Sequence, residues 1–148
     1  VKYKLDPING GGNELLIQSG LTNIQSDSGW IHTGDLVMKD ETGLLIWCGR
    51  KDEMIIKNGV NIYPVEIEKH LLLIAEIEEV LVTKEKHPVK GEIIIAFVKF
   101  FSGVYVSVEE INTRLRQVMA SIKVPDRIEI VSEFGYTPTG KRIKPVLN

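Results

Sequence analysis

The chain has 148 residues, with 18 lysines and arginines against 20 aspartates and glutamates, which gives a formal charge of −2. Hydrophobic residues make up 43% and charged residues 26%, a composition typical of globular proteins and unlike that of disordered or collagen-like chains. The near-neutral balance, without a run of like charges, gives no electrostatic footprint for nucleic acid or for an anionic membrane.

The sequence also argues against membrane spans and metal sites. Its most apolar run, residues 93–98, is far shorter than the ~18 residues of a spanning helix. The single cysteine, Cys48, excludes an internal disulfide, and no His or Cys pair has metal-ligand spacing. We therefore expect no transmembrane segment, no metal site and a cytoplasmic location. The chain has no initiator Met and no signal-peptide pattern, and it opens at Val1 in what looks like the middle of a strand, so we expect it to be part of something longer.

The first third of the chain is predicted to form strands and turns. Short apolar runs at residues 14–18, 30–37 and 44–48 are separated by glycine-containing breaks and show little helical periodicity. Fewer than 50 residues without an amphipathic helix are poorly equipped to bury a core. We expect this segment to pack on another part of a larger protein.

A boundary is predicted at residues 50–53, where four charged residues lie between two apolar runs. Beyond it, Asn58-Gly59 separates two short apolar runs, which predicts a hairpin with a type I′ turn because both positions tolerate positive φ. Pro64 can then open a helix, since its missing N–H costs nothing in the first turn. Apolar residues at helical spacing follow that proline.

The remaining elements predict an α+β fold. Strands are expected at residues 79–84, 92–100 and 127–131, and a helix after Ser107, which forms a capping-box pattern with Glu110. We expect a small three-stranded sheet with helices packed on one face, plus the two-stranded hairpin. The last segment, residues 136–148, is expected to be rich in turns.

Residues 135–141 match the G-x-x-x-x-G-K part of a phosphate-binding P-loop. A true P-loop opens a long helix and has Ser or Thr after the lysine. Here Arg142 follows, Pro138 lies inside the loop and Pro145 comes soon after. No helix can form, so we reject a P-loop nucleotidase and expect an exposed turn that carries Lys141.

Three ordered motifs closely resemble the adenylate-forming superfamily, the acyl-CoA synthetases and their relatives. They are residues 29–35 (GWIHTGD), residues 49–68 (GRKDEMIIKNGVNIYPVEIE) and residues 137–141 (TPTGK). The resemblance matches the C-terminal portion of such an enzyme. It implies that residues 1–51 are the β-rich tail of a large N-terminal domain and that residues 52–148 form a mobile C-terminal lid domain.

The resemblance implies an activity as well. Members of this family join a carboxylate to ATP, and then pass the acyl group to a thiol, commonly that of coenzyme A. The expected co-substrates are ATP with Mg²⁺ and coenzyme A, and the acid is a small carboxylic acid or a fatty acid. The expected partner is the missing N-terminal domain, without which the chain is expected to be inactive. Two alternatives are an adenylation domain that loads a carrier protein and a non-catalytic binding module with the lid fold.

Three residues acquire nucleotide-side roles by similarity. Asp35 would accept hydrogen bonds from both ribose hydroxyls, because an ionised carboxylate offers only acceptors. Arg50 would reach the ribose or phosphate side with its fixed guanidinium fork. Lys141 resembles the catalytic lysine of adenylation, whose ammonium stabilises the charge that builds when a carboxylate attacks the α-phosphate.

The remaining roles concern the hinge and the thiol. Asp52 falls at the family's hinge position, where a few residues absorb the rotation of the lid. Gly59 has no side chain, so its backbone could approach the pantetheine arm of coenzyme A, with Asn58 beside it. Lys57 is a candidate for the coenzyme A phosphates, and a solvated surface lysine is the other interpretation.

Overall fold

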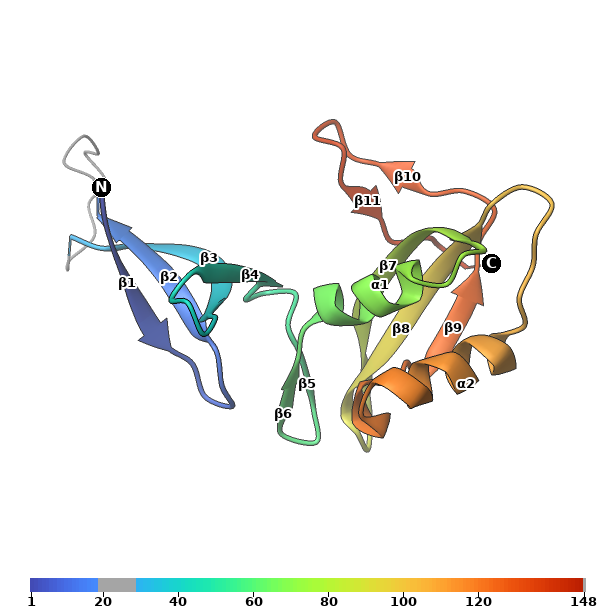
Figure 1. Cartoon of the computed structure of the whole chain (residues 1–148), viewed down its shortest axis with the longest axis horizontal. Coiled ribbons are helices and arrows are strands. Elements are labelled where there is room, and N and C mark those ends of the chain that lie inside the picture. Colours follow the sequence, from blue (N-terminus) through green and yellow to red (C-terminus); the bar gives the residue numbers. More distant parts are fainter. Residues whose placement is uncertain (19–28, 148) are drawn as a thin grey trace. The chain divides into compact units, whose positions relative to one another are not determined.

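The computed structural model describes residues 1–18 and 29–147. Contacts divide the chain into two compact units, Val1–Met54 and Ile55–Asn148. Figure 1 shows the elements of both units in chain order. Within the described residues, neither helix combines the length and the apolar character that a membrane span requires.

The first unit is a four-stranded antiparallel sheet in which each strand pairs with its neighbour in the chain. Its strands are β1 (Lys2–Pro7), β2 (Asn13–Gln18), β3 (Ile31–Lys39) and β4 (Leu45–Arg50). Its small core contains Leu16, Leu36, Val37 and Cys48. The described part of this unit contains no helix, as the sequence predicted, and β1 confirms the strand expected at the start of the chain.

The second unit opens with the hairpin predicted from Asn58-Gly59. Strands β5 (Ile55–Lys57) and β6 (Val60–Ile62) flank the turn, and the φ angles of Asn58 and Gly59 are 49° and 76°. Two positive φ angles are what a type I′ turn requires. Helix α1 (Pro64–Leu72) follows and has its proline at the first helical position, which confirms the predicted helix start.

The α+β class is confirmed, and the main sheet is larger than expected. Strands β7 (Ile77–His87), β8 (Gly91–Phe100) and β9 (Arg127–Ile130) are the three predicted strands, with β9 parallel to β8. The hairpin does not stand apart, because Lys57 pairs with Gly91 and so adds β5 and β6 to the same sheet. The described sheet therefore has five strands. Four of them follow the order β6-β5-β8-β7, and β9 also pairs with β8.

Both helices cover one face of this sheet, as predicted (Figure 1). Helix α2 (Val108–Val118) begins at Ser107, whose hydroxyl accepts the N–H of Glu110 at 3.2 Å. This contact confirms the predicted cap. The most deeply buried members of the apolar core beneath the helices are Ile55, Ile62, Ile67, Leu71, Ile94, Ala96, Val98 and Ile111.

The opposite face of the sheet carries a smaller apolar cluster of Ile95, Phe97 and Phe134. After Phe134 the chain forms a second hairpin of two very short strands, β10 (Gly135–Tyr136) and β11 (Arg142–Ile143). Figure 1 shows this hairpin set apart from both helices. The loop between its strands contains residues 137–141, so Lys141 is carried from the helix-free face.

Candidate functional site

The first cluster of candidate residues lies on the last two strands of the sheet in the first unit. Asp35 on β3 and Arg50 on β4 are cross-strand partners, and Arg50 Nη1 lies 3.3 Å from Asp35 Oδ1. Trp47 Nε1 also donates to Asp35 Oδ1, at 3.1 Å. The carboxylate is thus held by two donors while a third of the side chain stays exposed. A partly exposed, oriented carboxylate is suited to binding hydroxyl donors.

Sequence reasoning did not place Trp47 in this cluster. About half of the Trp47 surface is exposed. Its indole N–H bonds Asp35 across twelve residues of chain. The contact becomes visible only from the strand pairing, which places Trp47 opposite Val37, two residues from Asp35.

Gly34 provides the space that Arg50 occupies. The guanidinium donates to the carbonyl oxygen of Thr33 at 2.7 Å, and it lies directly against Gly34. A Cβ added at Gly34 would fall 2.7 Å from Arg50 Nη2, and φ at this glycine is +75°. Both the close approach and the backbone conformation therefore call for glycine.

Glu14 on β2 ties together the segments that carry Asp35 and Arg50. Only 2% of Glu14 is exposed. Its carboxylate accepts the backbone N–H of Gly34 at 3.2 Å and the ammonium of Lys51 at 2.7 Å. Burial raises the pKa of Glu14, but the hydrogen bonds from Lys51 and His32 lower it by more than burial raises it. The pKa of Glu14 therefore lies below its usual value. Glu14 thus fixes the residue before Asp35 and the residue after Arg50.

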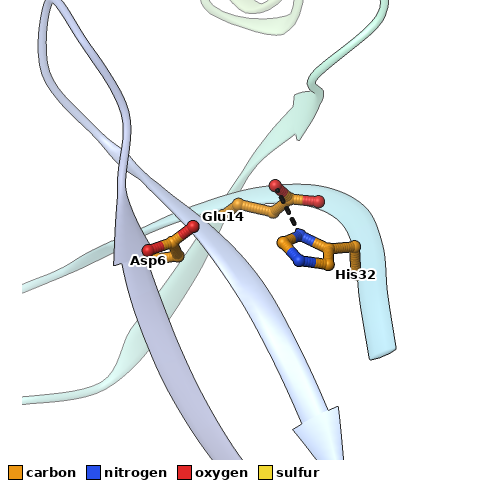
Figure 2. A group of neighbouring side chains, drawn as sticks. All are labelled: Asp6, Glu14 and His32. Carbon is orange, nitrogen blue, oxygen red and sulfur yellow. Dashed lines mark ion pairs between the residues drawn. The ribbon is translucent and has the colours of Figure 1, made fainter. Parts of the chain in front are cut away.

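Figure 2 shows Asp6, Glu14 and His32 directed toward one another. Their potential metal-ligand atoms all lie within 4.8 Å, although the sequence predicted no metal site. The three come from three different strands, so no spacing pattern could reveal them. Glu14 Oε2 already accepts Lys51 at 2.7 Å and faces His32 Nδ1 at 3.2 Å. A cation would have to displace that ammonium, so we assign the cluster to an ion-pair network.

Lys51 lies close to the end of the first unit, which runs to Met54. Its backbone N–H donates to Gly34 O at 2.7 Å, and its side chain binds Glu14. Asp52 is the next residue, and 77% of its side chain is exposed, with one ion-pair contact at 3.6 Å from Arg50 Nε. The predicted hinge residue therefore comes directly after a residue that is held at both backbone and side chain.

The turn that carries Lys141 is closed by local hydrogen bonds. The N–H of Thr137 donates to Lys141 O at 2.8 Å, and the N–H of Gly140 donates to Thr137 O at 2.9 Å. The Thr137 hydroxyl accepts the N–H of Lys141 at 3.0 Å. Strand β11 follows directly, so the lysine sits on a hairpin rather than at the start of a helix, which agrees with the rejection of a P-loop.

The predicted thiol-side residues lie at the β5–β6 hairpin. A Cβ added at Gly59 would meet nothing within 4 Å, so the backbone there is open to approach. Lys57 has a different setting from either sequence interpretation. Its side chain is only 9% exposed, and its ammonium binds both carboxylate oxygens of Asp126, at 2.9 and 2.8 Å.

Asp126 also accepts the backbone N–H of Ile94 at 2.9 Å. Burial raises the pKa of Asp126, but the hydrogen bonds from Ile94 and Lys57 outweigh it, so the pKa lies below the usual 3.8. The ion pair links the end of β5 to the segment before β9. Lys57 therefore anchors the hairpin from inside the unit.

The second unit matches a known protein family. The sequence profile of the AMP-binding enzyme C-terminal domain matches residues 66–141, just over half of the chain. This chain belongs to that family. Family membership confirms the resemblance drawn from the three motifs.

Two curated relatives of this AMP-binding enzyme C-terminal domain protein are CoA ligases. It is 35% identical over 116 residues to the long-chain-fatty-acid–CoA ligase of Bacillus subtilis, a match that covers 78% of this chain and 21% of the relative. The 2-succinylbenzoate–CoA ligase of a Geobacillus strain is also 35% identical, over 78% of this chain and 24% of the relative. The chain thus spans about a fifth to a quarter of these relatives.

Solved structures show the same relationship. The amide bond synthetase McbA from Marinactinospora thermotolerans is 25% identical, with a TM-score of 0.80 over 95% of this chain and 33% of that one. ATP-bound MatB from Rhodopseudomonas palustris is 28% identical, with a TM-score of 0.73 over 79% of this chain and 23% of that one. These structures support the fold assignment for the chain as a whole.

Proposed function

We propose that this chain is the C-terminal part of an ATP-dependent ligase that joins a carboxylic acid to coenzyme A through an acyl-adenylate. The observation that carries the proposal is the Asp35 carboxylate, held by Arg50 and Trp47, in a chain that continues into an AMP-binding enzyme C-terminal domain. The names of the curated relatives support the choice of coenzyme A as acceptor.

Asp35 would bind the ribose of the nucleotide. Both of its protein contacts are made through Oδ1, and a carboxylate can accept several hydrogen bonds at once. Hydroxyl donors from the ribose would therefore add to an acceptor that Arg50 and Trp47 already hold in one orientation. Arg50, which also bonds Thr33 O, would stay close enough to meet the ribose or a phosphate oxygen.

Lys141 would act in the first chemical step. An oxygen of the substrate carboxylate attacks the α-phosphorus of ATP, the bond to the bridging oxygen breaks, and pyrophosphate leaves with the electron pair. Negative charge builds on the phosphate oxygens as the two anions meet, and an ammonium placed there lowers the barrier. Loss of one such group typically slows the step ~10²–10³-fold.

The proposed division of the chain is a tail of the N-terminal domain at residues 1–51 and a lid at residues 52–148, with the hinge at Asp52. The tethering of Lys51 to Glu14 and Gly34 supports this division. The boundary between the two compact units lies a few residues further on, between Met54 and Ile55. The missing N-terminal domain would hold the ATP phosphates with Mg²⁺ and form the pocket for the acid.

The second step would use a different surface of the lid. The thiolate of coenzyme A attacks the acyl carbonyl, and the bond to the phosphate oxygen breaks so that AMP leaves. Asn58 and Gly59 would line the path of the pantetheine arm, because the turn is open around Gly59. Lys57, at the end of β5, would stabilise this turn through its ion pair with Asp126.

Carboxylate-dependent pyrophosphate release tests the proposal in the longer protein that contains this chain. We expect Lys141→Ala to lower the rate ~10²–10³-fold, and Lys86→Ala, at an exposed lysine on β7, to leave it unchanged. Pyrophosphate release that is equal in both variants would remove Lys141 from the mechanism. A protein that adenylates the acid but passes it only to a carrier protein would correct the choice of acceptor.

A further inference from the structure

The hairpin that carries Lys141 is too small to hold its own position. Only two residue pairs join its strands, Gly135 with Ile143 and Tyr136 with Arg142. Isolated two-stranded hairpins are marginally stable at best. Something outside the hairpin must therefore fix the loop of residues 137–141.

One carboxylate of the sheet contacts both strands of this hairpin. Glu79 Oε2 accepts the hydroxyl hydrogen of Tyr136 on β10, and Arg142 Nε on β11 lies 3.5 Å from the same oxygen. Tyr136 and Arg142 are cross-strand partners, and they are the residues immediately before and after the loop. Glu79 thus holds the base of the lysine loop on both sides.

The alternation of β7 explains why Glu79 reaches the hairpin. Val80 and Val82 belong to the core beneath the helices, so their neighbours in the strand face the other way. Leu81 packs there against the cluster that contains Phe134, the residue before β10. Glu79 lies on this same helix-free face, opposite Lys99 of β8.

A second carboxylate on the same strand contacts the chain beyond the hairpin. Glu85 Oε2 lies 3.5 Å from Lys144 Nζ and 3.0 Å from Arg127 Nη2. The segment is therefore attached by Phe134 before the hairpin, by Glu79 at the base of the loop and by Glu85 after it. Of these attachments, Glu79 is the one that touches the residues flanking the loop.

The electrostatics of the Tyr136–Glu79 contact agree with a tyrosine donor and a charged carboxylate acceptor. The hydrogen bond from Tyr136 is the main reason why the pKa of Glu79 lies below its usual value. The same bond raises the pKa of Tyr136. The tyrosine donor and the charged acceptor thus match each other at neutral pH.

We propose that Glu79 is a positioning residue for adenylation, which fixes the loop of Lys141 through Tyr136 and Arg142. The proposal rests on the role proposed above for Lys141. Half of Tyr136 is exposed, and contacts of charged groups in water contribute little to folding stability. A displacement of a reacting group by about 1 Å, however, can slow a reaction ~10²-fold. The contact therefore matters for the rate far more than for the fold.

The test compares Glu79→Ala and Tyr136→Phe with a matched control in the longer protein that contains this chain. Glu78 precedes Glu79 in the strand and contacts Lys99 Nζ at 2.9 Å, so Glu78→Ala removes the same charge without touching the hairpin. We expect both test variants to slow acyl-adenylate formation ~10–100-fold. Transfer from pre-formed acyl-adenylate to coenzyme A and the melting temperature should stay near wild type. Glu79→Gln, which keeps an acceptor for Tyr136, should recover part of the loss.

The double variant and hydrogen exchange provide two independent readouts. Tyr136→Phe removes only a hydrogen bond that Glu79→Ala also removes, so the double variant should be no slower than Glu79→Ala alone. Amide exchange at Thr137 and Lys141 should accelerate in Glu79→Ala and not in Glu78→Ala. Additive rate effects, equal loss of both half-reactions, or unchanged exchange would each overturn the positioning role.

These outcomes separate the inference from the proposed function. If Lys141→Ala abolishes adenylation and Glu79→Ala does not slow it, the function stands and the positioning role fails. If Lys141→Ala leaves adenylation intact, the proposed function fails, and the positioning role in adenylation fails with it.

Discussion

Asp35 and Arg50 face each other across β3 and β4, with Arg50 Nη1 3.3 Å from Asp35 Oδ1. Trp47 donates to the same oxygen, so the carboxylate is oriented by the protein itself. Groups that are held in place before the ligand arrives lose less entropy on binding. This relationship is the basis of the first two predictions.

Asp35→Asn should weaken ATP binding. The amide keeps one acceptor oxygen, which Arg50 and Trp47 would occupy, and replaces the other with an NH₂ donor, so the acceptor offered to the ribose hydroxyls is lost. Loss of a hydrogen bond to a charged group corresponds to about 10–100-fold in affinity, which steady-state kinetics would register as a higher KM for ATP. Glu41→Gln changes an exposed carboxylate near the next turn and serves as the control. An unaltered KM for ATP in Asp35→Asn would dissociate this residue from the nucleotide.

Gly34→Ala should act through Arg50. The new methyl group would lie 2.7 Å from Arg50 Nη2 and 3.0 Å from its Cζ, so the guanidinium must leave its place against Thr33 and Asp35. We expect the KM for ATP to rise about as much as in Arg50→Met, by roughly 10-fold. Gly43→Ala is the matched control, since Gly43 has φ of +86° and open space around it. Equal effects of the two alanines would assign the change to backbone strain.

A bulky residue at Gly59 should impair the thiol step and spare adenylation. Gly59 and Gly103 both have positive φ, +76° and +79°, and a Cβ at either would meet no atom within 4 Å. Gly59→Leu and Gly103→Leu therefore carry similar strain, and only the former obstructs the proposed pantetheine path. Transfer rates from pre-formed acyl-adenylate should fall in Gly59→Leu alone. A similar fall in both variants would point to strain rather than to coenzyme A.

Several elements of the fold could be predicted from local sequence signals. The Asn58-Gly59 turn, the proline start of α1 and the cap at Ser107 depend on residues close together in the chain. The helix-covered face was predictable as well, since apolar spacing marks it. Local patterns of this kind are sufficient for the elements and for the fold class.

The supporting contacts of the site could not be predicted in this way. Glu14 meets Lys51 across 37 residues, Lys57 meets Asp126 across 69, and Tyr136 meets Glu79 across 57. Each pair depends on strand register that no spacing pattern records. The same reason explains why the joining of the β5–β6 hairpin to the main sheet was missed, because it depends on the pairing of Lys57 with Gly91.

The Lys57–Asp126 pair should stabilise the second unit in a pH-dependent way. Removal of one partner of a nearly buried ion pair typically costs about 3 kcal/mol, so Lys57→Met and Asp126→Asn should both lower the free energy of unfolding at neutral pH. The pKa of Asp126 is depressed from its usual 3.8. Its contribution is therefore complete above that value and is lost as pH falls through the lower pKa of the folded state.

Chemical denaturation between about pH 7 and about pH 3 measures this contribution. The difference between wild type and Asp126→Asn should persist down to weakly acid pH and shrink only below 3.8. Glu109→Gln, at an exposed carboxylate of α2, should behave like wild type throughout. A stability difference that disappears well above that pH would contradict the assignment to Asp126.

The most direct measurement of the central claim is the separation of the two half-reactions in Lys141→Ala. If the lid delivers Lys141 only for adenylation, acyl-adenylate formation falls ~10²–10³-fold, while conversion of supplied acyl-adenylate and coenzyme A to thioester continues at the wild-type rate. Equal rates of adenylation in variant and wild type, or an equal loss in both half-reactions, would contradict the account.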